Sequence, residues 1–160
     1  MKVFYYFLPV VLVFLIPAAE AQTHIIKASS FFQIKQPGNI RVNEEGVPVK
    51  RPINKDRFII ITTDKKTVPI ITSITYNDVA MNYVIENIRL KKVSAGKTPA
   101  GKVVIIKALP KQFLWKIIIT DKDRKLIAED DVNIWLKWKA GKKNMKLKIQ
   151  ETEIAGPAYY

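Results

Sequence analysis

Cysteine is absent from the 160 residues of this chain, and histidine occurs once, at position 24. A chain without cysteine forms no disulfide bonds, thiolate metal sites, cysteine nucleophiles or lipid anchors on an N-terminal cysteine. The single histidine excludes a metal site made of several histidines. No serine stands in the Gly-x-Ser-x-Gly context of an activated nucleophile. The sequence therefore gives no support to a hydrolase with a Ser-His-Asp triad.

Glycine and acidic residues are also scarce. The chain has six Gly, and its 14 Asp and Glu stand against 27 Lys and Arg, which gives a net charge of +13. The low glycine content excludes a collagen-like repeat, and a hydrophobic fraction of 48% excludes a disordered protein. No phosphate-binding loop is present, because residues 95–98 lack the upstream glycine of a Walker A motif. Residues 97–101 instead predict a hairpin loop.

The first 21 residues have the pattern of a secretory signal peptide. Lys2 gives a positive start, residues 3–16 are apolar, and Ala19-Glu20-Ala21 places small residues at the −3 and −1 positions. This apolar run is shorter than the about 20 residues that a membrane-spanning helix needs. We expect cleavage before Gln22, export to the periplasm or the extracellular space, and no integral membrane span in the mature chain, residues 22–160, whose net charge stays at +13.

Alternating apolar and polar residues near the C-terminus predict an antiparallel β-hairpin. Residues 132–139 and 145–150 alternate in this way around a short connection that contains Gly141. Four apolar residues share one face of the first strand: Val132, Ile134, Leu136 and Trp138. Trp115 shares its face of an earlier strand with Ile117 and Ile119. This phase predicts that Trp115 and Trp138 are buried and that Trp135 is more accessible.

Other strands are predicted from β-branched and apolar runs between turn-rich segments. These runs are residues 25–35, 58–62, 68–76, 102–108 and 113–120, and the separating segments include residues 64–66 and 94–101. Three prolines between residues 36 and 56 confine any strand there, such as one at 47–50, to a sheet edge. Residues 77–90 fit either a strand with a bulge near Glu86-Asn87 or a helix.

These segments together predict an all-β fold with about seven to nine short strands and no long helix. The architecture expected from them is an antiparallel β-sandwich of immunoglobulin-like type, and a small barrel is the alternative. The sequence shows no internal repeat and no linker. We therefore expect residues 22–160 to form one domain.

The acidic residues do not form a recognisable catalytic pair. They cluster as Glu44-Glu45, as Asp121 with Asp123, and at 129–131, all in predicted turns or strand edges. A glycosidase needs two carboxyl groups about 5–10 Å apart in a cleft, and no predicted strand carries two acids on one inward face. Residues 121–125 also lack the third ligand and the glycine of a calcium loop. The sequence therefore predicts a non-catalytic protein that needs no cofactor.

An aromatic residue and four lysines are expected on the outer face of the C-terminal hairpin. We call this set the Lys/Trp face: Trp135, Lys137, Lys139, Lys146 and Lys148. Like charges opposite one another across strands repel. An anionic polymer would relieve that repulsion, and a base or sugar ring could stack on the indole. The competing interpretation is that the lysines keep a sheet surface soluble and discourage strand addition.

The expected mature N-terminus offers a second candidate site, Gln22-Thr23-His24. A free α-amine, two backbone amides and a histidine at the third position can close a four-nitrogen square plane, which Cu(II) and Ni(II) favour. Two classes of function remain. One is an interaction or structural module that holds an envelope protein or an anionic polymer, with nucleic acid less expected for an exported chain. The other is a protein that handles Cu(II) or Ni(II).

Overall fold

The computed structural model describes residues 23–35, 42–47, 54–120 and 132–155. Within these ranges the chain forms strands and no helix. The strands are β1 (Ile25–Lys35), β2 (Asn54–Thr63), β3 (Ile70–Tyr76), β4 (Val79–Ala80), β5 (Tyr83–Ile88), β6 (Lys92–Lys97), β7 (Val103–Lys107), β8 (Phe113–Ile119), β9 (Ile134–Ala140), β10 (Lys143–Ile149) and β11 (Glu151–Ile154). The prediction of an all-β fold is confirmed, with more strands than the seven to nine expected.

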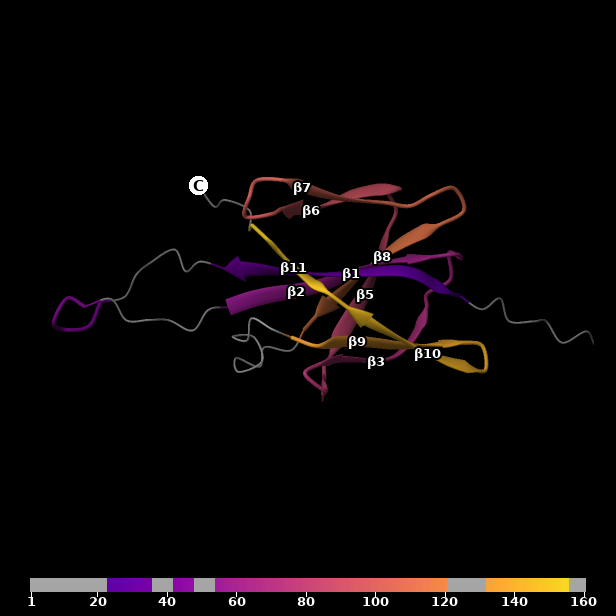
Figure 1. Ribbon diagram of the computed structural model, residues 1–160, viewed down its shortest axis with the longest axis horizontal. Coiled ribbons are helices and arrows are strands. Elements are labelled where there is room, and N and C mark those ends of the chain that lie inside the picture. Colours follow the sequence, from indigo (N-terminus) through magenta and orange to yellow (C-terminus); the bar gives the residue numbers. More distant parts are fainter. Residues whose placement is uncertain (1–22, 36–41, 48–53, 121–131, 156–160) are drawn as a thin grey trace, which may run out of the picture.

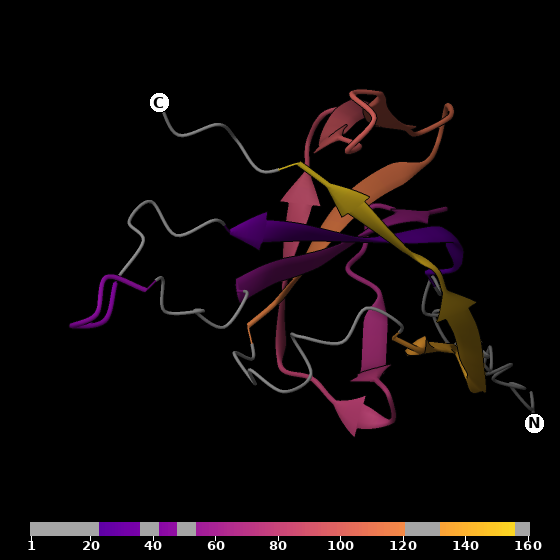
Figure 2. The same cartoon turned by 60° about the vertical axis from the view of Figure 1, so that its left-hand side comes forward.

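The strands form three sheets. The largest has five strands in the order β11-β1-β2-β8-β5, the second has four in the order β10-β9-β3-β4, and β6 and β7 form a separate hairpin. All pairings are antiparallel except that of β1 with β11, which is parallel. In Figures 1 and 2 the β6–β7 hairpin lies on one side of the five-stranded sheet and the four-stranded sheet lies on the other.

The main hydrophobic core lies between the two larger sheets. Ile59, Ile61 and Ile117 of the five-stranded sheet are fully buried there against Ile74 and Leu136 of the four-stranded sheet. Trp115 and Trp138 are each 5% exposed in the same cluster, whereas Trp135 is half-buried on the opposite face of β9. The predicted accessibility of the three tryptophans is confirmed, and so is the β9–β10 hairpin with its turn at Gly141.

A second hydrophobic cluster lies on the other face of the five-stranded sheet, beneath the β6–β7 hairpin. Ile60 and Leu114 of the sheet pack there with Val104 and Ile106 of the hairpin. The five-stranded sheet is therefore apolar on both faces. This explains why the middle of β2 is a continuous run of isoleucines rather than an alternating pattern.

Residues 77–90 form two short strands and neither the helix nor the bulge considered from the sequence. β4 pairs with β3 in the four-stranded sheet, and the chain then crosses to β5, whose register with β8 is uninterrupted. Tyr83 and Ile85 pack in the main core, and Ile88 packs in the second cluster. The change of apolar phase at Ile88 arises because both faces of β5 meet hydrophobic neighbours.

Residues 94–101 were expected to separate strands, but Lys92–Lys97 is itself a strand, β6. Its small residues gave no β-branched run to detect. The loop predicted at 97–101 does close the hairpin with β7: the Thr98 N–H donates to the Lys102 carbonyl, and the Gly101 N–H donates to the Thr98 carbonyl. The predicted signal peptide and most of the possible edge strand at 47–50 lie outside the described residues. Among the residues described, no helix has the length and apolar content to span a membrane.

Candidate functional site

The Lys/Trp face lies on the side of the four-stranded sheet that faces away from the main core. Adjacent strands set its spacing: Lys137 of β9 pairs with Lys146 of β10, and Trp135 pairs with Lys148. Lys139 extends the row along β9. All four lysines are exposed. The prediction that these residues share one face of the hairpin is therefore confirmed. The residues that alternate with them along the two strands, such as Leu136, Trp138 and Ile149, point into the main core.

The neighbouring strand β3 extends this surface with uncharged residues. Thr75 pairs with Trp135, and Ser73 pairs with Lys137. No Asp or Glu occurs in any of the four strands of this sheet. The positive charge of the face is thus not neutralised by a carboxylate within the sheet. The directly opposed Lys137 and Lys146 repel one another, at a cost of about 0.2–1 kcal/mol.

Trp135 and Lys146 make the closest contact on the face. The Lys146 Nζ atom lies 3.7 Å from the centroid of the Trp135 ring, which is a cation–π geometry. This contact joins β10 to β9 diagonally, because Lys146 is paired with Lys137 and not with Trp135. It also places a positive charge beside an aromatic plane, the pairing of groups that binds a sugar or base carrying a negative charge.

Two residues of the N-terminal candidate site, Thr23 and His24, are hydrogen-bonded to the segment at residues 64–67. Thr23 is buried, and its hydroxyl donates a hydrogen bond of 3.2 Å to the Thr67 carbonyl. The His24 backbone N–H donates to the Asp64 carboxylate at 2.7 Å. That nitrogen would have to lose its proton and bind the metal, so metal binding here must break the contact with Asp64. Gln22 lies outside the described residues.

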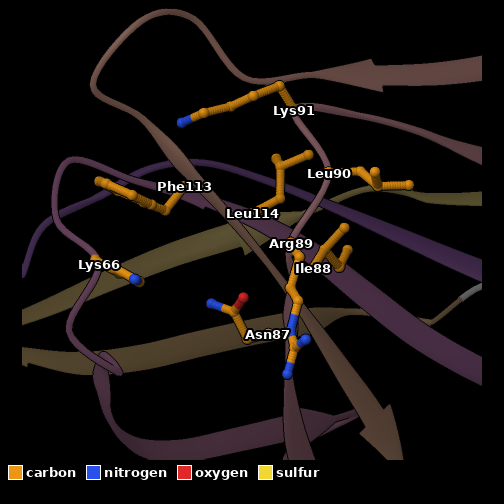
Figure 3. Close-up of a pocket in the computed structure, with 8 residues that line it drawn as sticks. All are labelled: Lys66, Asn87, Ile88, Arg89, Leu90, Lys91, Phe113 and Leu114. Carbon is orange, nitrogen blue, oxygen red and sulfur yellow. The ribbon is translucent and has the colours of Figure 1, made fainter.

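A pocket of about 640 Å³, not predicted from the sequence, lies at the end of the five-stranded sheet. Figure 3 shows the Lys66 ammonium and the Asn87 amide directed toward the same central space, with Arg89 and Lys91 at its edges. No carboxylate lines it. Lys91 is already engaged, because its Nζ atom donates to the Gln112 carbonyl and lies 4.4 Å from the centroid of the Phe113 ring.

A buried polar cluster lies between the sheets near the start of β11. The Arg57 Nε atom donates to Glu151 at 3.1 Å, and both side chains are at most 6% exposed. The Arg57 guanidinium lies 5.2 Å from the centroid of the Tyr76 ring, and the Tyr76 and Ser30 hydroxyls are 3.4 Å apart. The second Glu151 oxygen, Oε2, has no hydrogen-bond partner among the described residues.

Burial dominates the protonation of this cluster. Desolvation raises the pKa of Glu151 even though the neighbouring Arg57 acts to lower it. Desolvation also raises the pKa of Tyr76, so the phenol stays protonated at neutral pH. These groups are engaged with one another inside the fold. Their arrangement is that of a buried ion pair that fixes the position of β11 relative to β2.

The sequence contained signals for both sites that were missed. Arg57 is two and four residues from Ile59 and Ile61, so the alternation places it on the inward face of β2. Its partner Glu151 is 94 residues away, a distance that periodicity cannot bridge. All residues that line the pocket except Lys66 come from a stretch, residues 87–120, that contains no Asp or Glu.

Comparison with known proteins adds no relative from which a function could be transferred. No family model, curated protein or solved structure matches the chain. In the part of the chain that the structure describes, no group of three or more His, Asp or Glu residues is placed to hold a metal ion. The Lys/Trp face is the site with the best-defined arrangement.

Proposed function

We propose that this chain is an exported, non-catalytic module of the cell envelope that holds an anionic polymer on its Lys/Trp face. The observation that carries the proposal is the charge of the four-stranded sheet. Its outer face presents Trp135 and four lysines, and its strands contain no carboxylate. Export is supported by the N-terminal sequence pattern, and the interaction role by this face.

We further propose that the fold is an immunoglobulin-like β-sandwich. In that architecture strands A, B, E and D form one sheet and strands C, F and G form the other. The order β1-β2-β8-β5 matches the first sheet, and β3-β9-β10 matches the second, when β6 and β7 are treated as an insertion between strands D and E. The core shared by both sheets supports the same assignment.

An anionic polymer suits the face for an electrostatic reason. Phosphate, sulfate or carboxylate groups spaced along a polymer can contact several lysines at once, which removes the repulsion between Lys137 and Lys146. Trp135 adds a short-range contact that bulk charge cannot supply, because a ring of the polymer can stack beside the indole. The non-catalytic part of the proposal is supported by the sequence, in which no predicted strand carries two acids on one inward face.

The test compares two variants of equal charge. In the first, Lys137, Lys139, Lys146 and Lys148 are changed to Gln. In the reference variant the same change is made at Lys27, Lys65, Lys66 and Lys111, which lie outside the strands and the turns of the four-stranded sheet. Dissociation constants for polyphosphate, a sulfated glycan and an acidic polysaccharide are measured at two salt concentrations, with single-stranded DNA for comparison.

We expect the first variant to lose at least about tenfold more affinity than the reference variant, because contacts add to the screened long-range attraction. The Trp135→Ala variant should lose affinity without any change in charge. Equal losses in both quadruple variants would contradict the proposal, since they would show attraction by net charge alone. Absence of binding by the unmodified chain to every polymer would also reject it.

A further inference from the structure

The β6–β7 hairpin carries a second basic surface, and this one is mixed with apolar side chains. Its outward cross-strand pairs are Lys92 with Lys107, Ser94 with Ile105, and Lys97 with Val103. The alternate residues Val93, Val104 and Ile106 point inward to the second hydrophobic cluster. β7 is therefore apolar on both faces although only one face is covered.

Exposure shows how much apolar surface this leaves. Val103 is 45% exposed and Ile105 is 43% exposed. At the open end of the hairpin Leu90 and Leu109 are 68% and 64% exposed, next to the hydrogen bond that joins the Lys91 carbonyl to the Ala108 N–H. These four aliphatic side chains, two on β7 and two beyond the open end of the hairpin, lose contact with water only if something outside the described fold covers them.

The charge around these side chains has one sign. Residues 87–120 contain eight Lys and Arg and no Asp or Glu. Lys92, Lys97, Lys102 and Lys107 belong to the hairpin or its turn, and all four are exposed. Aliphatic side chains among lysines are the composition of surfaces that enter the headgroup region of an anionic bilayer, where the lysines meet lipid phosphates and the aliphatic groups reach the acyl boundary.

We propose that the outward face of the β6–β7 hairpin docks on a membrane surface rich in anionic lipids. A soluble polyanion would satisfy the lysines and would leave Val103 and Ile105 in water. An apolar protein groove would cover the aliphatic residues and leave the lysines without counter-ions. A bilayer with anionic headgroups offers both partners, with the apolar layer just beneath the charged one.

Docking through the hairpin would leave the Lys/Trp face free to bind a second partner. The five-stranded sheet separates the hairpin from the four-stranded sheet, so the hairpin face and the Lys/Trp face lie on opposite sides of the molecule (Figure 1). Three stacked layers, each about 10 Å from the next, place these surfaces about 20 Å apart, beyond the screening length of about 8–10 Å at ordinary ionic strength. The chain can therefore rest on a membrane and present the Lys/Trp face away from it.

The first experiment removes apolar surface without changing charge. Binding of the mature chain to vesicles of phosphatidylcholine mixed with phosphatidylglycerol is measured by co-sedimentation, with phosphatidylcholine vesicles as the neutral comparison. In the test variant Val103 and Ile105 are changed to Ser. In its control the same change is made at Val84 and Ile26, which are 50% and 53% exposed and lie on β5 and β1.

We expect the test variant to bind the anionic vesicles about tenfold more weakly than the unmodified chain and the control variant to bind them like it. Equal binding by all three proteins would overturn the proposal. Circular dichroism and the urea midpoint establish that each variant is folded. Because all four positions are already half-exposed, their change to Ser should leave the fold intact.

The second experiment separates the hairpin lysines from net charge. Lys92, Lys97, Lys102 and Lys107 are changed to Gln, and the result is compared with the reference variant defined above. We expect vesicle binding to fall at least about tenfold further in the hairpin variant. Equal losses would overturn the proposal, and so would a loss confined to the Lys/Trp-face variant, which would move the lipid contact to the other side.

A third measurement locates the contact directly and uses the absence of cysteine. An Ile105→Cys variant can be labelled at one position with a dye whose emission shifts to the blue on leaving water. Anionic vesicles should shift the emission of this variant and leave an Ile26→Cys variant unchanged. A shift at Ile26→Cys alone, or at neither position, would overturn the proposal. Loss of polymer binding on the Lys/Trp face would not affect any of these outcomes.

Discussion

The two larger sheets differ in how many of their faces are covered. The five-stranded sheet packs against the four-stranded sheet on one side and against the β6–β7 hairpin on the other. The four-stranded sheet buries only its inner face, and its outer face carries the lysines and Trp135. The central strands of the five-stranded sheet, β2 and β8, are covered on both faces and leave little surface for a partner. The candidate contact surfaces therefore lie on the two outer layers.

The sequences of the strands reflect this difference in coverage. β2 and β8 are apolar at consecutive positions, whereas β9 alternates strictly between buried and outward residues. Substitutions at the even-numbered positions of β9, which are buried, should therefore lower the stability of the fold far more than substitutions at its odd-numbered positions. In the apolar parts of β2 and β8, substitutions on either face of the strand should lower the stability, because both faces are covered.

The largest expected effect tests the buried tryptophans. Trp115→Ala and Trp138→Ala should each lower the free energy of unfolding by about 3–5 kcal/mol, because each leaves a cavity in the main core. Trp135→Ala should cost about 1 kcal/mol or less, because its ring lies on the outer face. Urea denaturation followed by circular dichroism measures all three. Equal losses would show that another element packs over Trp135.

A smaller effect compares the outward phases of the two sheets. Ile60 faces away from the main core yet is 3% exposed beneath the hairpin. Ile60→Ala should therefore destabilise the chain by about 2–4 kcal/mol. Thr75→Ala, on the outer face of the four-stranded sheet, should stay within about 0.5 kcal/mol of the unmodified chain. A mild effect at Ile60 would mean that the hairpin does not cover the sheet.

The smallest effect concerns the pH dependence of Glu151, at the edge of the covered sheet. Burial raises the native pKa of Glu151 above its ordinary value near 4.5. Between these two values the native state holds a proton that the unfolded state has lost, so the free energy of unfolding falls as the pH rises. The stabilisation is complete below the unfolded pKa and is lost as the pH rises through the native one.

The neutral variant Glu151→Gln isolates this contribution from the other carboxylates. Its stability is subtracted from that of the unmodified chain at a series of pH values on both sides of 4.5. The difference should fall with rising pH. A difference that grows instead would show that attraction to Arg57 outweighs burial.

Local pattern was sufficient for much of the fold. The alternation in residues 132–150 predicted the β9–β10 hairpin, the burial of Trp138 and the shared side of the Lys/Trp face. Its period matches the alternation of side chains along a strand, and a two-residue turn fixes the register. Nothing in the local pattern distinguished a bulge in residues 77–90 from a strand between two apolar layers. The strand β6 was missed because its packing depends on a sheet that is distant in sequence.

The sequence by itself determined that the chain is basic, lacks cysteine and is rich in strands, since these follow from composition and short-range periodicity. Only the tertiary structure decided which apolar residues remain uncovered and which charges are buried. Val103 and Val104 are alike in sequence, yet one is exposed and the other faces the second cluster. Arg57 and Glu151 meet only because β2 and β11 both flank β1. Long-range strand order decides such contacts, because it brings together residues whose separation along the chain exceeds any local period.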